Sequence, residues 1–88
     1  MTRNYEQVFP EFNRIFCEIM KDDSIQLRYE TTAKDVENWD SLNHIQLIVA
    51  LEKHFEIQFN FAELQKLTNI GEWCVNIVAK LNEKQENL

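Results

Sequence analysis

The sequence predicts an all-α fold, a small four-helix bundle with three main helices, one short helix and a long first loop. Apolar residues recur at the roughly 3.6-residue period of helix faces. The chain has one glycine and one proline, so few residues favour tight turns, and this disfavours a many-stranded sheet. With 88 residues, 44% of them apolar, the chain can bury one modest core. We therefore expect a single domain with its core over about residues 8–82 and a polar, fraying tail over residues 83–88.

The first helix is expected over about residues 8–20. One face is formed by residues spaced at i, i+4, i+7, i+8 and i+11, namely Val8, Phe12, Ile15, Phe16 and Ile19. Because proline is tolerated in a first turn and disrupts a helix interior, Pro10 predicts a start near Val8.

Residues 21–40 show no sustained period and predict a long loop. A structureless loop of this length is uncommon in a compact domain unless it is pinned down. Isolated apolar residues recur along it and indicate contacts with the helices: Ile25, Leu27, Tyr29, Val36 and Trp39. A short helical turn is expected near residues 34–37.

The second helix is expected over residues 41–55, with Asp40 as its N-cap. At about 100° per residue, a core face gathers His44, Leu47, Ile48, Leu51 and Phe55. A second apolar stripe, formed by Leu42, Ile45 and Val49, lies beside Gln46, Glu52 and Lys53, and a single core-facing helix does not require it. Either neighbouring elements cover this stripe, or it is an exposed docking surface beside Ser41.

Two further helices follow. Asn60 with Glu63 three residues later indicates a capped start for a short helix through Leu64 and Leu67. Thr68 and Asn69 then offer a cap for the last helix. Its apolar stripe is the most regular in the chain and comprises Ile70, Trp73, Cys74, Ile77, Val78 and Leu81.

The composition of the chain argues against several classes of function. The net charge of −6 disfavours a nucleic-acid binder, which needs basic residues to neutralise phosphates. No apolar run approaches the roughly 18 residues of a membrane span, and no signal core is present. Cys17 and Cys74 lie on helix faces without metal or CxxC spacing, so we expect buried free thiols. We therefore expect a cytoplasmic monomer that binds neither nucleic acid nor membrane.

The residues do not form a catalytic or metal constellation. Ser41 and His44 are three apart, but His44 projects toward the core and no glycine loop offers an oxyanion hole. The acidic residues of the first loop lack the spacing of a calcium loop: Asp22, Asp23, Glu30 and Asp35. What remains is Ser41 as an acceptor of modification, because phosphate at a helix N-terminus meets N–H groups and the positive end of the dipole. Plain capping by Asp40 explains the same residues.

The order of these features resembles the acyl carrier protein family. The resemblance covers roughly residues 8–82 and is most specific over residues 32–42 (TAKDVENWDSL), 47–55 (LIVALEKHF) and 67–70 (LTNI). It implies that Ser41 bears 4'-phosphopantetheine, that Asp40 is its motif partner, and that the arm's thiol holds an acyl or aminoacyl group as a thioester. It also implies that the chain is not an enzyme. Partner enzymes would contact the second helix through Leu42, Asn43, Ile45, Gln46, Val49 and Glu52.

The implied partners are a phosphopantetheinyl transferase, which uses Mg²⁺ and coenzyme A, an acyl-loading ligase or acyltransferase, and synthase enzymes of fatty acid or polyketide biosynthesis. An apolar acyl group would be sheltered among Leu47, Leu51, Ala62 and Leu67.

The chain departs from the family pattern at Asn38-Trp39, where many members have glycine, and at Asn43, Gln46 and Lys53, where primary fatty acid carriers are more acidic. These departures predict a specialised pathway. Two alternatives are an acidic helical adaptor without a prosthetic group and, more remotely, a helix-turn-helix DNA binder.

Overall fold

The computed structural model describes residues 4–37 and 39–86 and is all-helical over them. The elements are α1 (Tyr5–Met20), a 3₁₀ turn η1 (Ala33–Asp35), α2 (Ser41–Phe55), α3 (Phe61–Lys66) and α4 (Ile70–Glu86). The predicted fold class is confirmed, with three main helices, one short helix and a long first loop. No helix among these residues has both the length and the apolar character needed to cross a bilayer.

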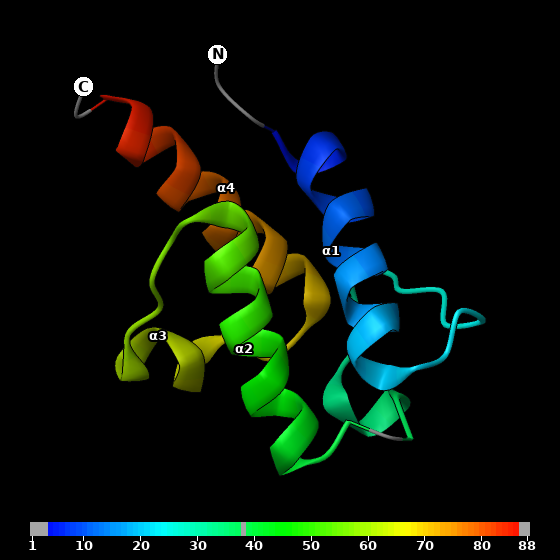
Figure 1. Ribbon diagram of the computed structural model, residues 1–88. Helices are drawn as coiled ribbons and strands as arrows, with labels where there is room; N and C mark the ends of the chain where they lie inside the picture. The colour runs from blue at the N-terminus through cyan, green and yellow to red at the C-terminus, as the bar shows by residue number, and fades with distance from the viewer. Residues whose placement is uncertain (1–3, 38, 87–88) are drawn as a thin grey trace.

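The three long helices pack together, and α3 lies to one side of α2 (Figure 1). The start of α1 and the end of α4 lie at one end of the bundle. The first turn of α2 lies at the opposite end, where the chain arrives from the long loop and η1 (Figure 1). Ser41, the first residue of α2, is therefore presented at the end of the bundle opposite the start of α1 and the end of α4.

The predicted core stripes are confirmed, and Trp73 of α4 lies at their centre. Its side chain is only 1% exposed. The ring centroid of Trp73 lies 6.3 Å from that of Phe12, 5.7 Å from His44 and 5.6 Å from Phe59. One indole thus joins α1, α2 and the segment after α2. Pairs of rings at such distances add to the burial of their apolar area.

The start of α1 differs from the sequence prediction. The helix begins at Tyr5, so Pro10 lies inside it and not in its first turn. Asn4 and Gln7 form a reciprocal capping box: the Gln7 N–H donates to Asn4 Oδ1 at 3.0 Å, and the Asn4 N–H donates to Gln7 Oε1 at 3.1 Å. The box fixes the helix start. The helix tolerates the loss of one backbone hydrogen bond at Pro10, which has no N–H to donate.

Two helices end on non-glycine residues in the left-handed conformation. Lys21 after α1 has φ 57°, and Glu56 after α2 has φ 55°. The Glu56 N–H donates to the carbonyl of Glu52, as expected for a left-handed C-cap. Glycine usually occupies such positions, but the predicted ends at residues 20 and 55 are confirmed without it.

The single glycine serves the attachment of the long loop to α4. The first N–H groups of α4 have no acceptor within the helix. The Ile70 N–H donates to the Thr31 carbonyl at 2.9 Å, and the Gly71 N–H donates to the Tyr29 carbonyl at 2.8 Å. A Cβ atom at Gly71 would overlap the ring of Tyr29. Glycine is needed here for close approach, and the prediction that the loop is pinned is confirmed.

Both later helices have the predicted polar starts. Asn60 and Glu63 form a capping box at α3. Lys80 Nζ lies 2.8 Å from Glu63 Oε1, and this hydrogen bond is the main cause of the lowered pKa of the Glu63 carboxyl. At α4 the Glu72 N–H donates to Asn69 Oδ1 at 2.8 Å. The α3 helix is therefore tied to α4 by a partly buried ion pair.

The last helix continues to Glu86, beyond the core bound expected near residue 82, and the fraying of the tail stays a prediction. Residues 83–86 contain Glu, Lys and Gln, which favour helix, and no glycine or proline interrupts them. Asn87 and Leu88 lie outside the described residues.

We expect Gly71→Ala to destabilise the fold. Alanine is better than glycine in a helix by up to roughly 1 kcal/mol, but forcing the Tyr29 ring aside costs about 1–3 kcal/mol. The net loss should be on the order of 1 kcal/mol in a urea unfolding titration. In a Tyr29→Ala background the same change should cost less or become favourable. An equal cost in both backgrounds would contradict the close contact.

Candidate functional site

Ser41 is the first residue of α2, and its side chain is exposed. Asp40 is the N-cap, as predicted: its Oδ1 accepts the Asn43 N–H at 2.8 Å, and its carbonyl accepts the His44 N–H at 2.9 Å. Asp40 therefore closes the first turn by itself. The Ser41 hydroxyl is not needed for capping and stands at the positive end of the helix dipole.

Trp39 holds the end of the loop against the first turn of α2. Its indole Nε1–H donates to His44 Nδ1 at 3.0 Å. The other side of Trp39 meets Phe16 of α1 edge-on, with ring centroids 5.1 Å apart. From the sequence, anchoring the loop was the only reason for a tryptophan at this position. The available sequence signal was a large aromatic residue, Trp39, directly before the cap residue Asp40, followed by His44 one turn into the helix. Asn38 lies outside the described residues.

His44 is neutral in this arrangement. The indole N–H can only donate, so Nδ1 must be unprotonated and the ring proton lies on Nε2. Partial burial lowers the pKa of His44 from its ordinary value because desolvation disfavours the charged form. The Trp73 ring also lies edge-on to His44, with ring centroids 5.7 Å apart. His44 is thus a structural ring beside Ser41.

The second apolar stripe of α2 is exposed. Leu42, Ile45 and Val49 are 64%, 59% and 56% exposed, whereas Leu47, Leu51 and Phe55 on the core face are buried. The alternative in which neighbouring elements cover the stripe is therefore wrong. Leu42, Ile45 and Val49, which we call the α2 strip, run from Ser41 along about two turns of the helix.

The other three residues predicted to meet partners differ among themselves. Gln46 is exposed, while Asn43 and Glu52 are half-buried. Glu52 Oε2 accepts the Phe59 N–H at 2.9 Å. One carboxylate oxygen of Glu52 is thus engaged in holding the segment after α2.

Two hollows lie near the first loop. The smaller, of about 420 Å³, is lined by Ser41 itself together with Ala33, Trp39, Asp40, His44 and Ile45. Ala33 was not predicted to lie beside Ser41, because it belongs to η1 and reaches the hollow only through the fold of the loop.

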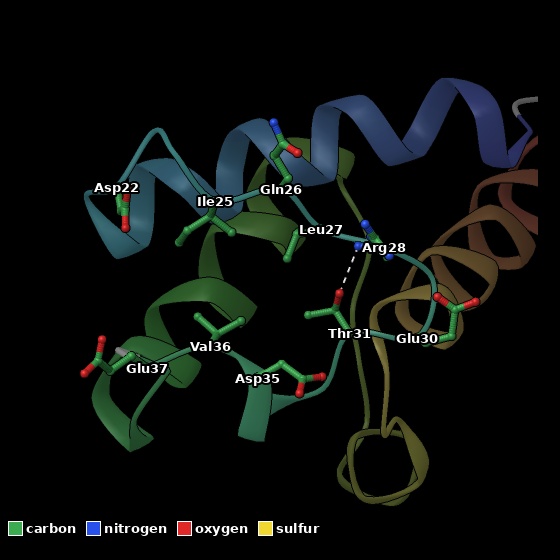
Figure 2. A pocket seen from close by; sticks show the side chains of 10 residues that line it. All are labelled: Asp22, Ile25, Gln26, Leu27, Arg28, Glu30, Thr31, Asp35, Val36 and Glu37. Carbon is green, nitrogen blue, oxygen red and sulfur yellow. Dashed lines mark hydrogen bonds between the residues drawn. The ribbon is translucent and has the colours of Figure 1, made fainter.

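The larger hollow, of about 520 Å³, lies between the long loop and the segment around η1. Figure 2 shows Ile25 and Leu27 facing Val36 across it, with Asp22, Glu30 and Glu37 toward its edge. Ser41 does not line it.

Both cysteines are buried free thiols, as predicted. Burial raises the pKa of the Cys74 thiol to about 12, which keeps it protonated and unreactive. Over the part of the chain that the structure describes, no three His, Cys, Asp or Glu side chains are grouped to hold a metal ion.

Comparison with known proteins identifies the family. The phosphopantetheine attachment site family matches residues 13–82. The chain is 43% identical to the holo acyl carrier protein from Geobacter metallireducens in its solution NMR structure. The match has a TM-score of 0.86 and covers 92% of this chain and 93% of that one. It is also 29% identical over 77 residues to the acyl carrier protein of Clostridium acetobutylicum, covering 88% of this chain and 99% of that protein. The chain belongs to the acyl carrier protein family.

Acyl carrier proteins are carriers and not enzymes, and their prosthetic group is covalently attached 4'-phosphopantetheine. The residues here fit that group. Ser41 offers an exposed hydroxyl in the first turn of a 15-residue helix, where N–H groups and the dipole favour a phosphate. The adjoining hollow leaves space beside that hydroxyl.

We expect the stability of the protein to fall as the pH drops below 6.5, the ordinary pKa of histidine. The folded-state pKa of His44 is lower than that of the unfolded chain, so the unfolded chain binds a proton first. Stability from neutral His44 is fully present above pH 6.5 and is lost as the pH falls through the folded-state pKa. Thermal unfolding at a series of pH values measures this.

His44→Asn keeps a hydrogen-bond acceptor near the Trp39 N–H but removes the titrating ring. This variant should therefore weaken the pH dependence of stability below pH 6.5. His54→Gln is the matched control at the other histidine, which lies 3.0 Å from Glu11 Oε1, and should retain it. If His54→Gln flattens the profile and His44→Asn does not, the assignment to His44 is wrong.

Proposed function

We propose that Ser41 is the residue to which phosphopantetheine is attached, and that the chain presents a thioester on that arm to partner enzymes. The observation that supports this most directly is the exposed Ser41 hydroxyl in a first turn already capped by Asp40. In the modification, Ser41 Oγ forms a bond to the phosphorus next to pantetheine in coenzyme A, and the phosphoanhydride bond breaks. Adenosine 3',5'-bisphosphate leaves, and the hydroxyl proton passes to a base of the transferase.

We also propose that the α2 strip is the docking surface for the transferase, the loading enzyme and the synthase enzymes. An exposed row of three large apolar side chains beside the modified serine is the kind of patch that partners cover. The net charge of −6 favours partners whose rim is basic.

Asn43, Gln46 and Lys53 support a specialised pathway, because they make α2 less acidic than in carriers of primary fatty acid synthesis. The cargo under this proposal is an acyl, hydroxyacyl or aminoacyl group loaded by a dedicated enzyme. Leu47 and Leu51 are fully buried, Leu67 is half-buried and Ala62 is exposed. A shelter for an apolar cargo among them requires these core side chains to part, and it stays a prediction.

We expect intact-mass spectrometry to show the addition of one phosphopantetheine after incubation with coenzyme A, Mg²⁺ and a competent transferase. Ser41→Ala should add none and retain the fold, since exposed substitutions usually change stability by less than about 0.5 kcal/mol. Ser24→Ala, at the only other serine, should be modified like the wild type. Modification of the Ser41→Ala protein, or none of the wild type, would refute the proposal.

The role of the α2 strip can be tested with a matched pair of valines. Val49→Lys should lower kcat/KM of the transferase for this protein by about tenfold, the effect of losing one good interface contact. Val75 of α4 is similarly exposed, at 51%, and Val75→Lys should leave the rate near that of the wild type. Equal rates for both variants would show that docking does not use the strip. Circular dichroism checks that both fold.

A further inference from the structure

The hollow beside Ser41 is built from three separate stretches of chain. Ala33 comes from η1, Trp39 from the end of the long loop, and Ser41, His44 and Ile45 from the first two turns of α2. The Trp39–His44 hydrogen bond and the contact of Trp39 with Phe16 fix the indole in place. Its volume of about 420 Å³ lies within the range of small-ligand sites.

The walls of this hollow offer mainly hydrocarbon and ring surface. The only hydrogen-bond donor of the Trp39 side chain is already used by His44. The side chains of Ala33 and Ile45 are exposed and apolar. The Asp40 carboxylate at the edge is engaged with the Asn43 N–H. A ligand segment that fits here is therefore short, apolar and attached next to Ser41.

We propose that this hollow binds the root of the prosthetic arm, specifically the dimethyl-substituted carbon that follows the phosphate in phosphopantetheine. The inference rests on attachment at Ser41, proposed above. Only the phosphate and one methylene separate the Ser41 oxygen from that carbon, so the two methyl groups cannot move far from the residues that line the hollow with Ser41. Burying them against Trp39, Ala33 and Ile45 removes apolar surface from water.

The rest of the arm has a different character. Beyond the dimethyl carbon it contains a hydroxyl, two amides and the thiol, all of which water solvates well. A root held in the hollow would thus restrict where the arm leaves the protein while its thiol stays accessible to partners. The Trp39–His44 pair would then position the arm, in addition to holding the loop.

The test uses the holo protein, with one phosphopantetheine first confirmed by mass. In NMR spectra we expect nuclear Overhauser effects between the two pantoyl methyl groups and the Trp39 ring protons, and an upfield ring-current shift of those methyls. The Trp39 indole N–H should shift between apo and holo protein, more than that of the buried Trp73. Holo protein lacking these effects, or with methyl contacts to the α2 strip or to exposed Phe61, would overturn the inference and leave attachment at Ser41 standing.

Two variants distinguish binding of the arm in the hollow from general effects on the fold. Ala33→Leu fills the hollow from its exposed edge and should reduce the methyl shift and the Overhauser effects at least twofold. Ala79→Leu, at an exposed alanine of α4, should leave both unchanged. If the two holo variants give the same spectra at the pantoyl methyls, the hollow does not bind the root of the arm.

Discussion

The hydrogen bond from Trp39 Nε1–H to His44 Nδ1, 3.0 Å long, determines where Ser41 lies. It fixes the last residue before the Asp40 cap to the first turn of α2. Trp39 also contacts Phe16, and His44 contacts Trp73, so the same two rings link this turn to α1 and α4. Without this bond a polar indole nitrogen would be left against the core, and the end of the long loop would lose its attachment.

Because of this constraint, α2 can bury one apolar face in the core and expose another. Leu47, Leu51 and Phe55 bury one face, while the α2 strip leaves another apolar face in solvent. Exposing such a strip costs solubility and contributes nothing to folding. A helix can keep it only if the opposite face and the flanking loop supply enough packing, which the ring contacts of Trp73 and Trp39 provide.

Hydrophobic periodicity predicted the core stripes and the exposed α2 strip, and the capping residues predicted the polar starts of α2, α3 and α4. Prediction from sequence failed where a specific contact overrides a local preference. The Asn4–Gln7 box starts α1 before Pro10, and Gly71 is needed for Tyr29, which lies far away in sequence. The predicted helix ends at Met20 and Phe55 are confirmed, although left-handed Lys21 and Glu56 follow them in place of glycine. The Asp40-Ser41 arrangement follows from sequence, but the hollow beside it does not, because Ala33 and Trp39 reach it through the fold of the loop.

The geometry of α2 also bears on which enzymes could use this carrier. Glu52, the one acidic residue among those predicted to meet partners, accepts the Phe59 N–H with one carboxylate oxygen, and Asn43 and Gln46 are uncharged. A partner that selects carriers by pairing basic residues with an acidic α2 would find few charges here. The recognition that remains is burial of Leu42, Ile45 and Val49. Under the proposed function, selectivity would therefore rest on the shape of an apolar groove in the partner, and long-range charge would mainly affect the rate of encounter.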